Sequence, residues 1–252
     1  VIEMKTRVVL FSLALSMALT GCGGKFHARS ASMPDSPGTE LKFDLGGGGS
    51  SSDADFEAGP DHSTDYAVEF PALWDGKHPD SLRWTRATVL AIEEHGEDML
   101  TSMPSDIDSY CPRFRGLQRQ EKIAFWVHLI SAIAQKESGM DPTKEYREGF
   151  ENSKQERVMS RGLLQLSLES ANHPKYGCGF ASEAEIEDPI KNLTCGVRIL
   201  NHWMRMEPVI SRGTEKEWYG ASKYWGVLRT SETRSFISTK TSELPICHSV
   251  SI

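Results

Sequence analysis

The spacing of apolar positions divides the chain into a polar segment and a region of helical periodicity. Between residue 23 and about residue 70 the sequence is rich in Gly, Ser, Asp and Pro, and its apolar residues are isolated. Such a composition buries too little apolar surface to offset chain entropy, so we expect a flexible linker over residues 22–70. Over residues 71–252 apolar residues recur at three- and four-residue steps, which predicts a helical domain.

Four segments of this domain have a helical pattern. The clearest follows Gln118-Arg119-Gln120-Glu121, where apolar residues occupy most sides, as expected of a central buried helix. The others span residues 82–100, 168–172 and 189–206, the last with Asp188 as N-cap before a proline at the first helical position. Residues 219–237 mix helical and turn signals, and no alternating strand of useful length stands out. We therefore predict a mainly α single domain.

The first residues have the pattern of an export signal. Two basic residues precede an apolar run over residues 8–19, which is short for a membrane span but typical of a secretory signal peptide. We assign the signal to residues 1–21. The ending Leu19-Thr20-Gly21-Cys22 resembles the bacterial lipobox, which implies acylation of Cys22; the alternative is an ordinary cleaved signal and a free cysteine. We expect an exported lipoprotein of the cell envelope, held on a membrane face by its lipid.

Charge and cysteine content narrow the possible partners and cofactors. The chain has 28 Lys and Arg against 35 Asp and Glu, with no basic cluster, so nucleic acid is not an expected partner.

Besides Cys22 there are four cysteines, and an even number in an exported chain favours two disulfides. Of three possible pairings we prefer Cys178 with Cys195, which flank a helix-entry loop, and Cys111 with Cys247, which would attach the C-terminal tail to the front of the domain. Scattered histidines and the lack of CxxC or HExxH motifs indicate no metal and no cofactor.

One acidic residue stands out at the end of the expected central helix. Glu137 lies where the negative end of the helix dipole opposes ionisation, and the nearby Ile133 and Met140 would add desolvation. Both effects raise the pKa of a carboxyl, and a carboxyl that stays protonated near neutral pH can act as a general acid. Taken alone, Glu137 could equally be a surface residue beside Lys136.

Three motifs, in order, give this glutamate a context. They are AIAQKES at 132–138, SRGLLQLS at 160–167, and Asp188-Pro189 followed by Asn192, Gly196 and Leu200. Together they resemble the soluble lytic transglycosylase and goose-type lysozyme superfamily over about residues 120–230. The resemblance implies a lysozyme-like helical domain with a substrate cleft, in a protein that we expect to be a monomer. It also implies cleavage of the β-1,4 bond between N-acetylmuramic acid and N-acetylglucosamine in peptidoglycan glycan strands, with a single Glu as acid and base.

The resemblance assigns a role to each matching residue. Glu137 would be the catalytic acid and base, Ser138 its companion, Gly162 a point of close backbone approach to a sugar, and Gln165 a hydrogen-bond partner of the substrate. Ser160 and Leu164 belong to the same substrate-binding segment, with Leu164 replacing the usual Met. The family's late Ala-Tyr-Asn motif is absent as such. Lys223-Tyr224-Trp225-Gly226 is nearest to it, so Tyr224 is the candidate phenol; Tyr219-Gly220 is the alternative alignment, and both aromatics could belong to the core.

The mode of cleavage and the class of protein stay open. A lytic transglycosylase closes an anhydro ring with help from the muramoyl acetamido group, whereas a hydrolytic lysozyme needs a second carboxylate. Candidates for the second carboxylate are Asp141, Glu145, Glu148, Glu151 and Glu156. These residues also suggest an acidic cleft suited to deacetylated strands, in which one of them would replace the missing acetamido group. Alternatives from other classes are a non-catalytic peptidoglycan-binding lipoprotein and a peptidase built on Cys178 and His173.

Overall fold

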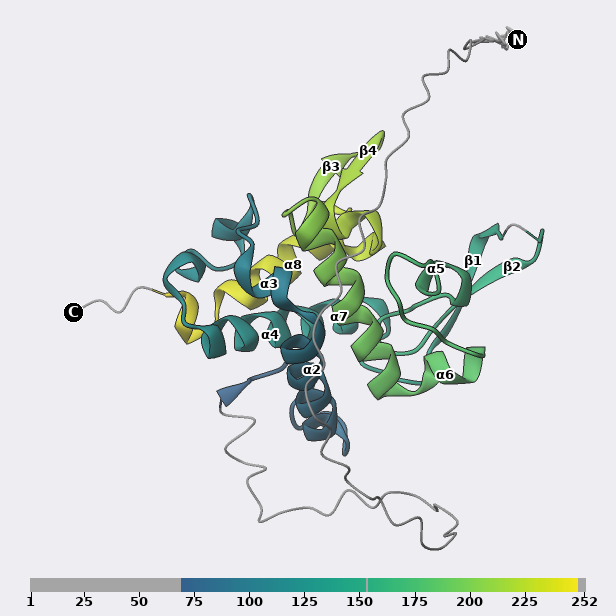
Figure 1. Cartoon of the computed structure of the whole chain (residues 1–252), viewed down its shortest axis with the longest axis horizontal. Coiled ribbons are helices and arrows are strands. Elements are labelled where there is room, and N and C mark those ends of the chain that lie inside the picture. The colour runs from purple at the N-terminus through teal and green to yellow at the C-terminus, as the bar shows by residue number, and fades with distance from the viewer. Residues whose placement is uncertain (1–68, 153, 249–252) are drawn as a thin grey trace, which may run out of the picture. The chain divides into compact units, whose positions relative to one another are not determined.

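The computed structural model describes residues 69–152 and 154–248 (Figure 1). The expected signal segment, Cys22 and all but the last two residues of the expected linker lie outside the described residues. Phe70 is already buried in the core. In chain order the elements are α2 (Ser81–His95), α3 (Glu97–Thr101), η1 (Ile107–Ser109), η2 (Phe114–Gly116), α4 (Arg119–Glu137), β1 (Glu145–Glu151), β2 (Arg157–Arg161), α5 (Leu168–Ala171), α6 (Glu183–Glu187), α7 (Pro189–Met206), β3 (Arg212–Thr214), β4 (Glu217–Tyr219), η3 (Gly220–Lys223), η4 (Gly226–Leu228), α8 (Ser231–Ser242) and η5 (Pro245–Cys247).

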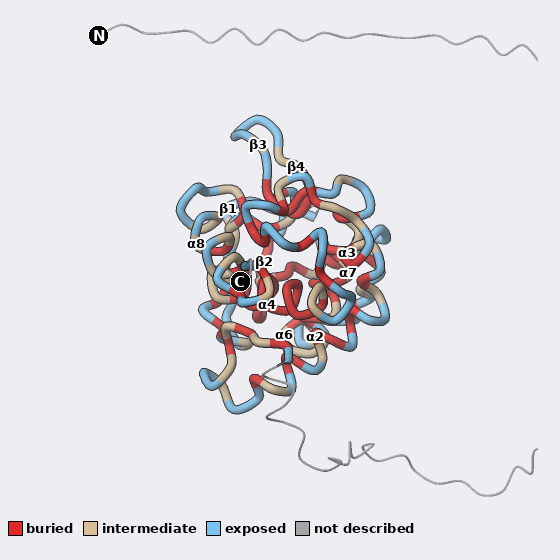
Figure 2. The backbone as a smooth tube through the Cα atoms, turned by 90° about the vertical axis from the view of Figure 1, so that its left-hand side faces the viewer, coloured by how far each residue is buried: buried red, intermediate tan, exposed pale blue. Residues whose placement is uncertain are grey.

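Helix α4 is the centre of the hydrophobic core. Its residues from Ile123 to Ala134 are all buried, so nearly every side of the helix is packed. The helix begins with a capping box, in which the Gln118 side chain accepts from the backbone of Glu121 and the Glu121 carboxylate accepts from the Gln118 N–H at 2.7 Å. Helices α2, α3 and α8 pack against α4, and Figure 2 shows buried backbone gathered along it. The predicted mainly α fold with a buried central helix is confirmed.

Helix α7 packs one apolar face against the rest of the domain. It contacts α2, α3, α6 and η3. It begins as predicted, because the Asp188 carboxylate accepts the backbone N–H groups of Ile190 at 2.8 Å and Lys191 at 3.1 Å, directly before Pro189. Within the described residues, no helix is both long enough and apolar enough to cross a membrane.

The acidic segment after α4 forms a hairpin, which corrects the expectation of a loop and of no strands. Strand β1 pairs antiparallel with β2, with Tyr146 opposite Ser160 and an irregularity between Arg147 and Glu151. Every residue of β1 except the half-buried Glu148 is exposed, so the strand lacks the alternation of apolar and polar residues that would reveal it in the sequence. A second, shorter hairpin pairs β3 with β4.

One expected helix is interrupted, and the segment of mixed signals forms several short elements. The helix expected over residues 82–100 divides into α2 and α3, because Gly96 leaves helical geometry at φ −101° and ψ 21° while its N–H still bonds to the Ile92 carbonyl. The mixed segment 219–237 forms the two short helices η3 and η4 before α8 begins. Thr230 is the N-cap of α8, and its side chain accepts from the backbone N–H of Thr233.

Both disulfides of the preferred pairing are present. Cys111 is bonded to Cys247, which ties the loop after η1 to the C-terminal helix η5. Cys178 is bonded to Cys195, which ties the loop between α5 and α6 to the middle of α7. With its sulfur in a disulfide, Cys178 has no thiolate to act as a nucleophile beside His173, so the peptidase alternative is wrong.

Candidate active site

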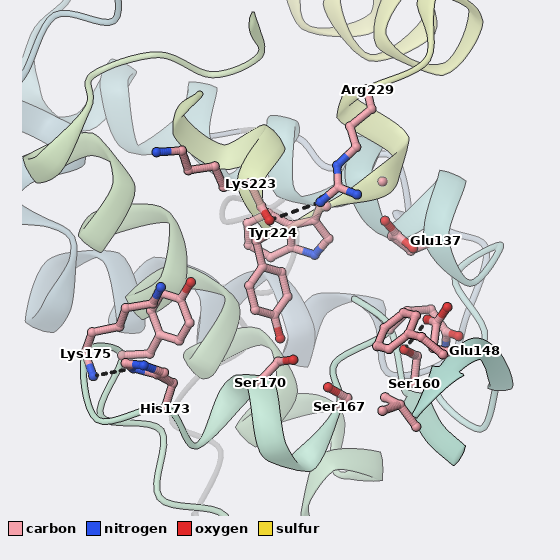
Figure 3. Close-up of a pocket in the computed structure, with 16 residues that line it drawn as sticks. Glu137, Glu148, Ser160, Ser167, Ser170, His173, Lys175, Lys223, Tyr224 and Arg229 are labelled. Carbon is pink, nitrogen blue, oxygen red and sulfur yellow. Dashed lines mark hydrogen bonds between the residues drawn. The ribbon is translucent and has the colours of Figure 1, made fainter. Parts of the chain in front are cut away.

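A pocket of about 360 Å³ opens beside the C-terminal end of α4 (Figure 3). Its walls come from the end of α4, the β1–β2 hairpin, the segment around α5, and the η3–η4 region. Two carboxylates and several cationic side chains therefore share one cavity. The lining residues are Glu137, Glu148, Phe150, Val158, Ser160, Gln165, Ser167, Ser170, His173, Lys175, Tyr176, Lys223, Tyr224, Trp225, Gly226 and Arg229.

Glu137 is the last residue of α4 and has a strongly raised pKa. Burial is the main cause and, together with the negative charge of Glu148, raises the pKa of Glu137 to about 7. Two contacts act in the opposite direction, because the Val227 backbone N–H donates to this carboxylate and the Arg229 guanidinium attracts its negative charge. Glu137 is therefore largely protonated at slightly acidic pH, while groups that can stabilise its ionised form are already in place.

Glu148 is the second carboxylate of the pocket. It is the one half-buried residue of β1, and the Ser160 hydroxyl from β2 donates to its Oε1 at 2.6 Å. The two residues lie on paired strands, so the hairpin itself sets this contact. Figure 3 shows Glu137 and Glu148 on the same side of the pocket. The sequence-predicted Ser160 thus lies in the site, and its hydroxyl positions a carboxylate there.

The other acidic residues of this segment interact with neighbours outside the pocket lining. Asp141 accepts from the backbone and hydroxyl of Thr143, Glu145 pairs with Arg161, Glu151 pairs with Arg157 at 3.7 Å, and Glu156 accepts from Asn152 at 3.1 Å. The cationic side chains of Lys175, Lys223 and Arg229 line the same pocket as the two glutamates. The expected acidic cleft is therefore wrong: the cavity has mixed charge, with one carboxylate from the hairpin.

The turn after β2 is shaped by α7. Gly162 has φ +74°, and a Cβ there would lie 2.6 Å from Asn192 Nδ2 and 2.8 Å from the Ile186 carbonyl. The buried Asn192 amide accepts from the Leu164 N–H at 2.9 Å and donates to the carbonyls of Arg161 and Ile186. These contacts explain why the glycine and asparagine of two separate motifs occur together: both are needed to seat the turn on α7.

Three residues expected at the substrate are instead structural. The described lining of the pocket does not include Ser138, Gly162 or Leu164. The Ser138 hydroxyl donates to the Ala134 carbonyl at 3.1 Å and accepts from the Met140 N–H at 3.1 Å, which closes the end of α4. Leu164 is buried, and its side chain occupies the space left by Gly196 on α7. These residues hold the helix end and the turn from which the pocket is built.

Gln165 lies in the pocket wall, as predicted. Its backbone has φ +47°, and its Nε2 donates to the carbonyls of Lys144 and Gly162, each at 2.9 Å. These bonds fix the side chain against the base of the hairpin. They also leave the Oε1 atom as the group that can accept a hydrogen bond from a sugar hydroxyl.

Of the two tyrosines that the alternative alignments offer, Tyr224 lines the pocket and Tyr219 does not. Tyr224 lies in the pocket wall, where burial raises its pKa and keeps the phenol neutral. The Tyr219 hydroxyl donates to Glu217 at 2.6 Å on the β3–β4 hairpin, away from the described lining. Trp225 is almost completely buried, and its Nε1 donates to the Leu164 carbonyl at 3.1 Å. Trp225 occupies the position where the family's Ala-Tyr-Asn motif has its asparagine. In this chain that position therefore supports the turn after β2 and supplies no amide.

Several residues of the site have no signal in the sequence. Arg229 follows η4, and its Nε and one guanidinium nitrogen donate to the carbonyls of Ser222 and Lys223. Lys175 and Phe150 lie on segments whose sequences look like ordinary polar surface. Only their place in the wall of the same pocket as Glu137, and not their spacing in the chain, marks them as candidates for the site.

Comparisons with known proteins agree with this geometry. The family described as "Transglycosylase SLT domain" matches residues 117–212. The solved structure "Bd0314 DslA wild-type form 2" is similar to this chain, with a TM-score of 0.68 and 34% identity over 71% of this chain and 99% of that chain. Two glutamate-to-glutamine mutants of DslA match equally well, and their mutated glutamates lie eleven positions apart, as Glu137 and Glu148 do here. None of the curated proteins compared with the chain matches it.

Proposed function

The chain belongs to the transglycosylase SLT domain family, and from this membership we propose that it cleaves peptidoglycan glycan strands at the β-1,4 bond between N-acetylmuramic acid and N-acetylglucosamine. Glu137 is the general acid. The observation that carries the proposal is a carboxyl with a pKa of about 7 in the wall of a pocket large enough for a sugar. A group with this pKa is protonated in part at neutral pH and can give its proton to a departing glycosidic oxygen.

The surroundings of Glu137 suit both halves of such a reaction. Before proton transfer, burial favours the neutral acid. After transfer, the Val227 N–H and the Arg229 guanidinium stabilise the carboxylate, which can then accept a proton from the attacking group, water in hydrolysis or a sugar hydroxyl in ring closure. The same residue therefore acts first as an acid and then as a base.

The presence of Glu148 favours hydrolysis, which uses two carboxylates, over the single-glutamate mechanism, which closes an anhydro ring. A second carboxylate in the pocket can stabilise the oxocarbenium-like transition state or activate water, and a single-glutamate mechanism has no use for it. Its contact with Ser160 fixes its position, and its charge contributes to the raised pKa of Glu137. The equal spacing of the two mutated glutamates in DslA supports a paired role.

Glu148 also supports a second candidate substrate, the deacetylated glycan strand. A deacetylated muramoyl unit lacks the acetamido carbonyl that assists a single-glutamate mechanism, and the Glu148 carboxylate can take over that role. The mixed charge of the pocket removes the electrostatic argument for this substrate, so the proposal depends on Glu148 alone. Initial rates on acetylated and enzymatically deacetylated sacculi decide it, and equal or slower cleavage of the deacetylated strands would contradict it.

The decisive experiment for the proposed function is digestion of purified sacculi with mass spectrometry of the products. Reducing-end products without anhydro sugars support hydrolysis. We expect Glu137→Gln to lower the rate by about two to four orders of magnitude, because the amide has no transferable proton. Glu93→Gln, at an exposed position on α2, is the matched control and should keep full activity. No turnover by the parent protein would favour the non-catalytic binding alternative.

We further propose that an acyl group on Cys22 holds the protein on a membrane of the cell envelope. The Cys22→Ser variant should then move from the membrane pellet to the soluble fraction after lysis without detergent. Because Cys22 is far in sequence from the pocket residues, activity on sacculi should not change. A variant that remains in the pellet would show that another feature is the anchor.

A further inference from the structure

We propose that Lys175, with Lys223 beside it, forms a subsite that binds a carboxylate of the muramoyl unit, either the lactyl carboxylate itself or one from the attached stem peptide. This inference rests on the proposed function, because it assigns a specificity determinant to the same pocket. In Figure 3 Lys175, His173 and Lys223 lie at one side of the pocket, and Glu137 and Glu148 lie at the other, with Tyr224 between them. The pocket therefore has a basic end, with Lys175 and Lys223, and an opposite end where the two glutamates lie near Arg229.

Two aromatic rings lie close to the ammonium of the exposed Lys175 side chain. Its Nζ lies 4.8 Å from the centre of the Tyr176 ring and 4.7 Å from the centre of the Trp203 ring. Contact with two ring faces holds a cation in place without neutralising its charge. Tyr176 and Trp203 are themselves buried, so this support is rigid.

The charge of Lys175 is not balanced within the part of the chain that the structure describes. Lys223 also lies over Trp203, at 5.1 Å, but it forms an ion pair with Glu207. No carboxylate of the described residues forms an ion pair with Lys175. The basic end also affects His202, whose pKa is lowered mainly by burial and further by the charges of Lys175 and Arg205. Lys175 is an exposed residue that lines the pocket, so its ammonium is accessible and can form an ion pair with an anionic group of the substrate.

A glycan strand offers suitable anions on its muramoyl units. A denuded muramoyl unit has a free lactyl carboxylate, whereas in a peptide-bearing unit that group is an amide and the nearest carboxylates belong to the peptide. N-acetylglucosamine has no anionic group. A carboxylate subsite would therefore distinguish muramoyl from glucosaminyl units and set the register of the strand relative to Glu137.

The test compares three substrates and three variants. The substrates are denuded strands, the same strands with the lactyl carboxylate converted to a neutral amide, and peptide-bearing strands. The variants are Lys175→Gln, the charge-conserving Lys175→Arg, and Lys216→Gln, which removes one positive charge at the exposed turn of the β3–β4 hairpin. For Lys175→Gln we expect kcat/KM to fall about tenfold, the size expected from loss of one charge-assisted hydrogen bond, mostly through a higher KM.

The outcomes separate this inference from the proposed function. A loss restricted to denuded strands identifies the lactyl carboxylate, and a loss restricted to peptide-bearing strands identifies a peptide carboxylate. Either result should be accompanied by near-normal activity of Lys175→Arg and Lys216→Gln. An equal loss on the amidated strands, or no loss on any substrate, overturns the subsite while leaving glycan cleavage intact. Absence of cleavage by the parent protein on all three substrates overturns the proposed function instead.

Discussion

At the residue scale, the chemistry of the pocket depends on the proton affinity of Glu137. Burial and Glu148 raise its pKa to about 7, and the Val227 N–H and Arg229 limit that rise. This balance is useful to a glycosidase, because an acid with an ordinary carboxyl pKa would be ionised at neutral pH, and one raised much further would be a poor proton donor. Glu137 and the residues that set this balance come from three separate segments of the chain: the end of α4, strand β1 and the η4 region.

The pH dependence of cleavage follows from this pKa. A general acid acts in its protonated form, so we expect kcat/KM to fall as the pH rises through about 7, the pKa of Glu137. Because the negative charge of Glu148 helps to raise that pKa, Glu148→Gln should move the midpoint to lower pH. The pH profile of the variant's residual activity and a carbon-13 NMR titration of the Glu137 carboxyl both measure the shift in pKa. A midpoint that stays in place or moves upward would contradict the coupling of the two carboxylates.

At the element scale, the site is an arrangement of a helix end, a hairpin and a turn, each held by contacts remote from the substrate. Ser138 closes α4 just beyond Glu137, and Ser160 on β2 orients Glu148 on β1. Asn192 on α7 bonds to both sides of the turn that contains Gly162. The family motifs at these positions therefore describe how the pocket is built as much as what it binds.

The glycine of this turn is the most sensitive structural position. Gly162→Ala should lower the free energy of unfolding by about 2 kcal/mol or more, because a positive φ is unfavourable for alanine and the added Cβ would overlap Asn192 and the Ile186 carbonyl. The matched control is Gly116→Ala, where a Cβ would meet no atom within 4 Å, and we expect it to change stability by less than about 0.5 kcal/mol. Denaturant unfolding measures both. Equal stability of the two variants would show that the turn can move away from α7.

At the scale of the whole domain, the two disulfides affect different properties, one the stability of the fold and the other the geometry of the pocket. The bridge from Cys111 to Cys247 joins residues 136 positions apart and ties η5 to the loop after η1. The bridge from Cys178 to Cys195 spans 17 positions and fixes to α7 the loop that contains His173, Lys175 and Tyr176. The first therefore concerns the stability of the fold, and the second the geometry of the basic end of the pocket.

Replacement of each cysteine pair by alanine tests these two effects separately. In the chain-entropy account the long loop contributes about 4 to 5 kcal/mol and the short loop about 3 kcal/mol, so loss of Cys111–Cys247 should lower stability more. Loss of Cys178–Cys195 should instead raise the KM for glycan strands more strongly, because Lys175 loses its support. Calorimetry and steady-state kinetics measure the two effects. A reversed order in both measurements would contradict the assignment.

The sequence by itself determined the helical class, the central helix with Glu137 at its end, and the start of α7 at Asp188. These features depend on local periodicity, helix capping and residue type, which a single segment contains. The sequence was less informative about the hairpin and about Gly96, because exposed strands and single glycines leave little trace in the apolar pattern. The preferred disulfide pairs followed from the expected positions of their segments.

Only the tertiary structure decided which residues meet at the pocket. It selected Glu148 from five carboxylates of similar sequence context, because pairing of β1 with β2 directs that one toward the cavity and against Ser160. It brought Lys175 and Arg229 to the same cavity from segments that look like ordinary surface. It also assigned Ser138 and Leu164 to support rather than to substrate. The physical reason is that charge interaction, burial and contact act through distance in space, whereas the pattern of a sequence records only distance along the chain.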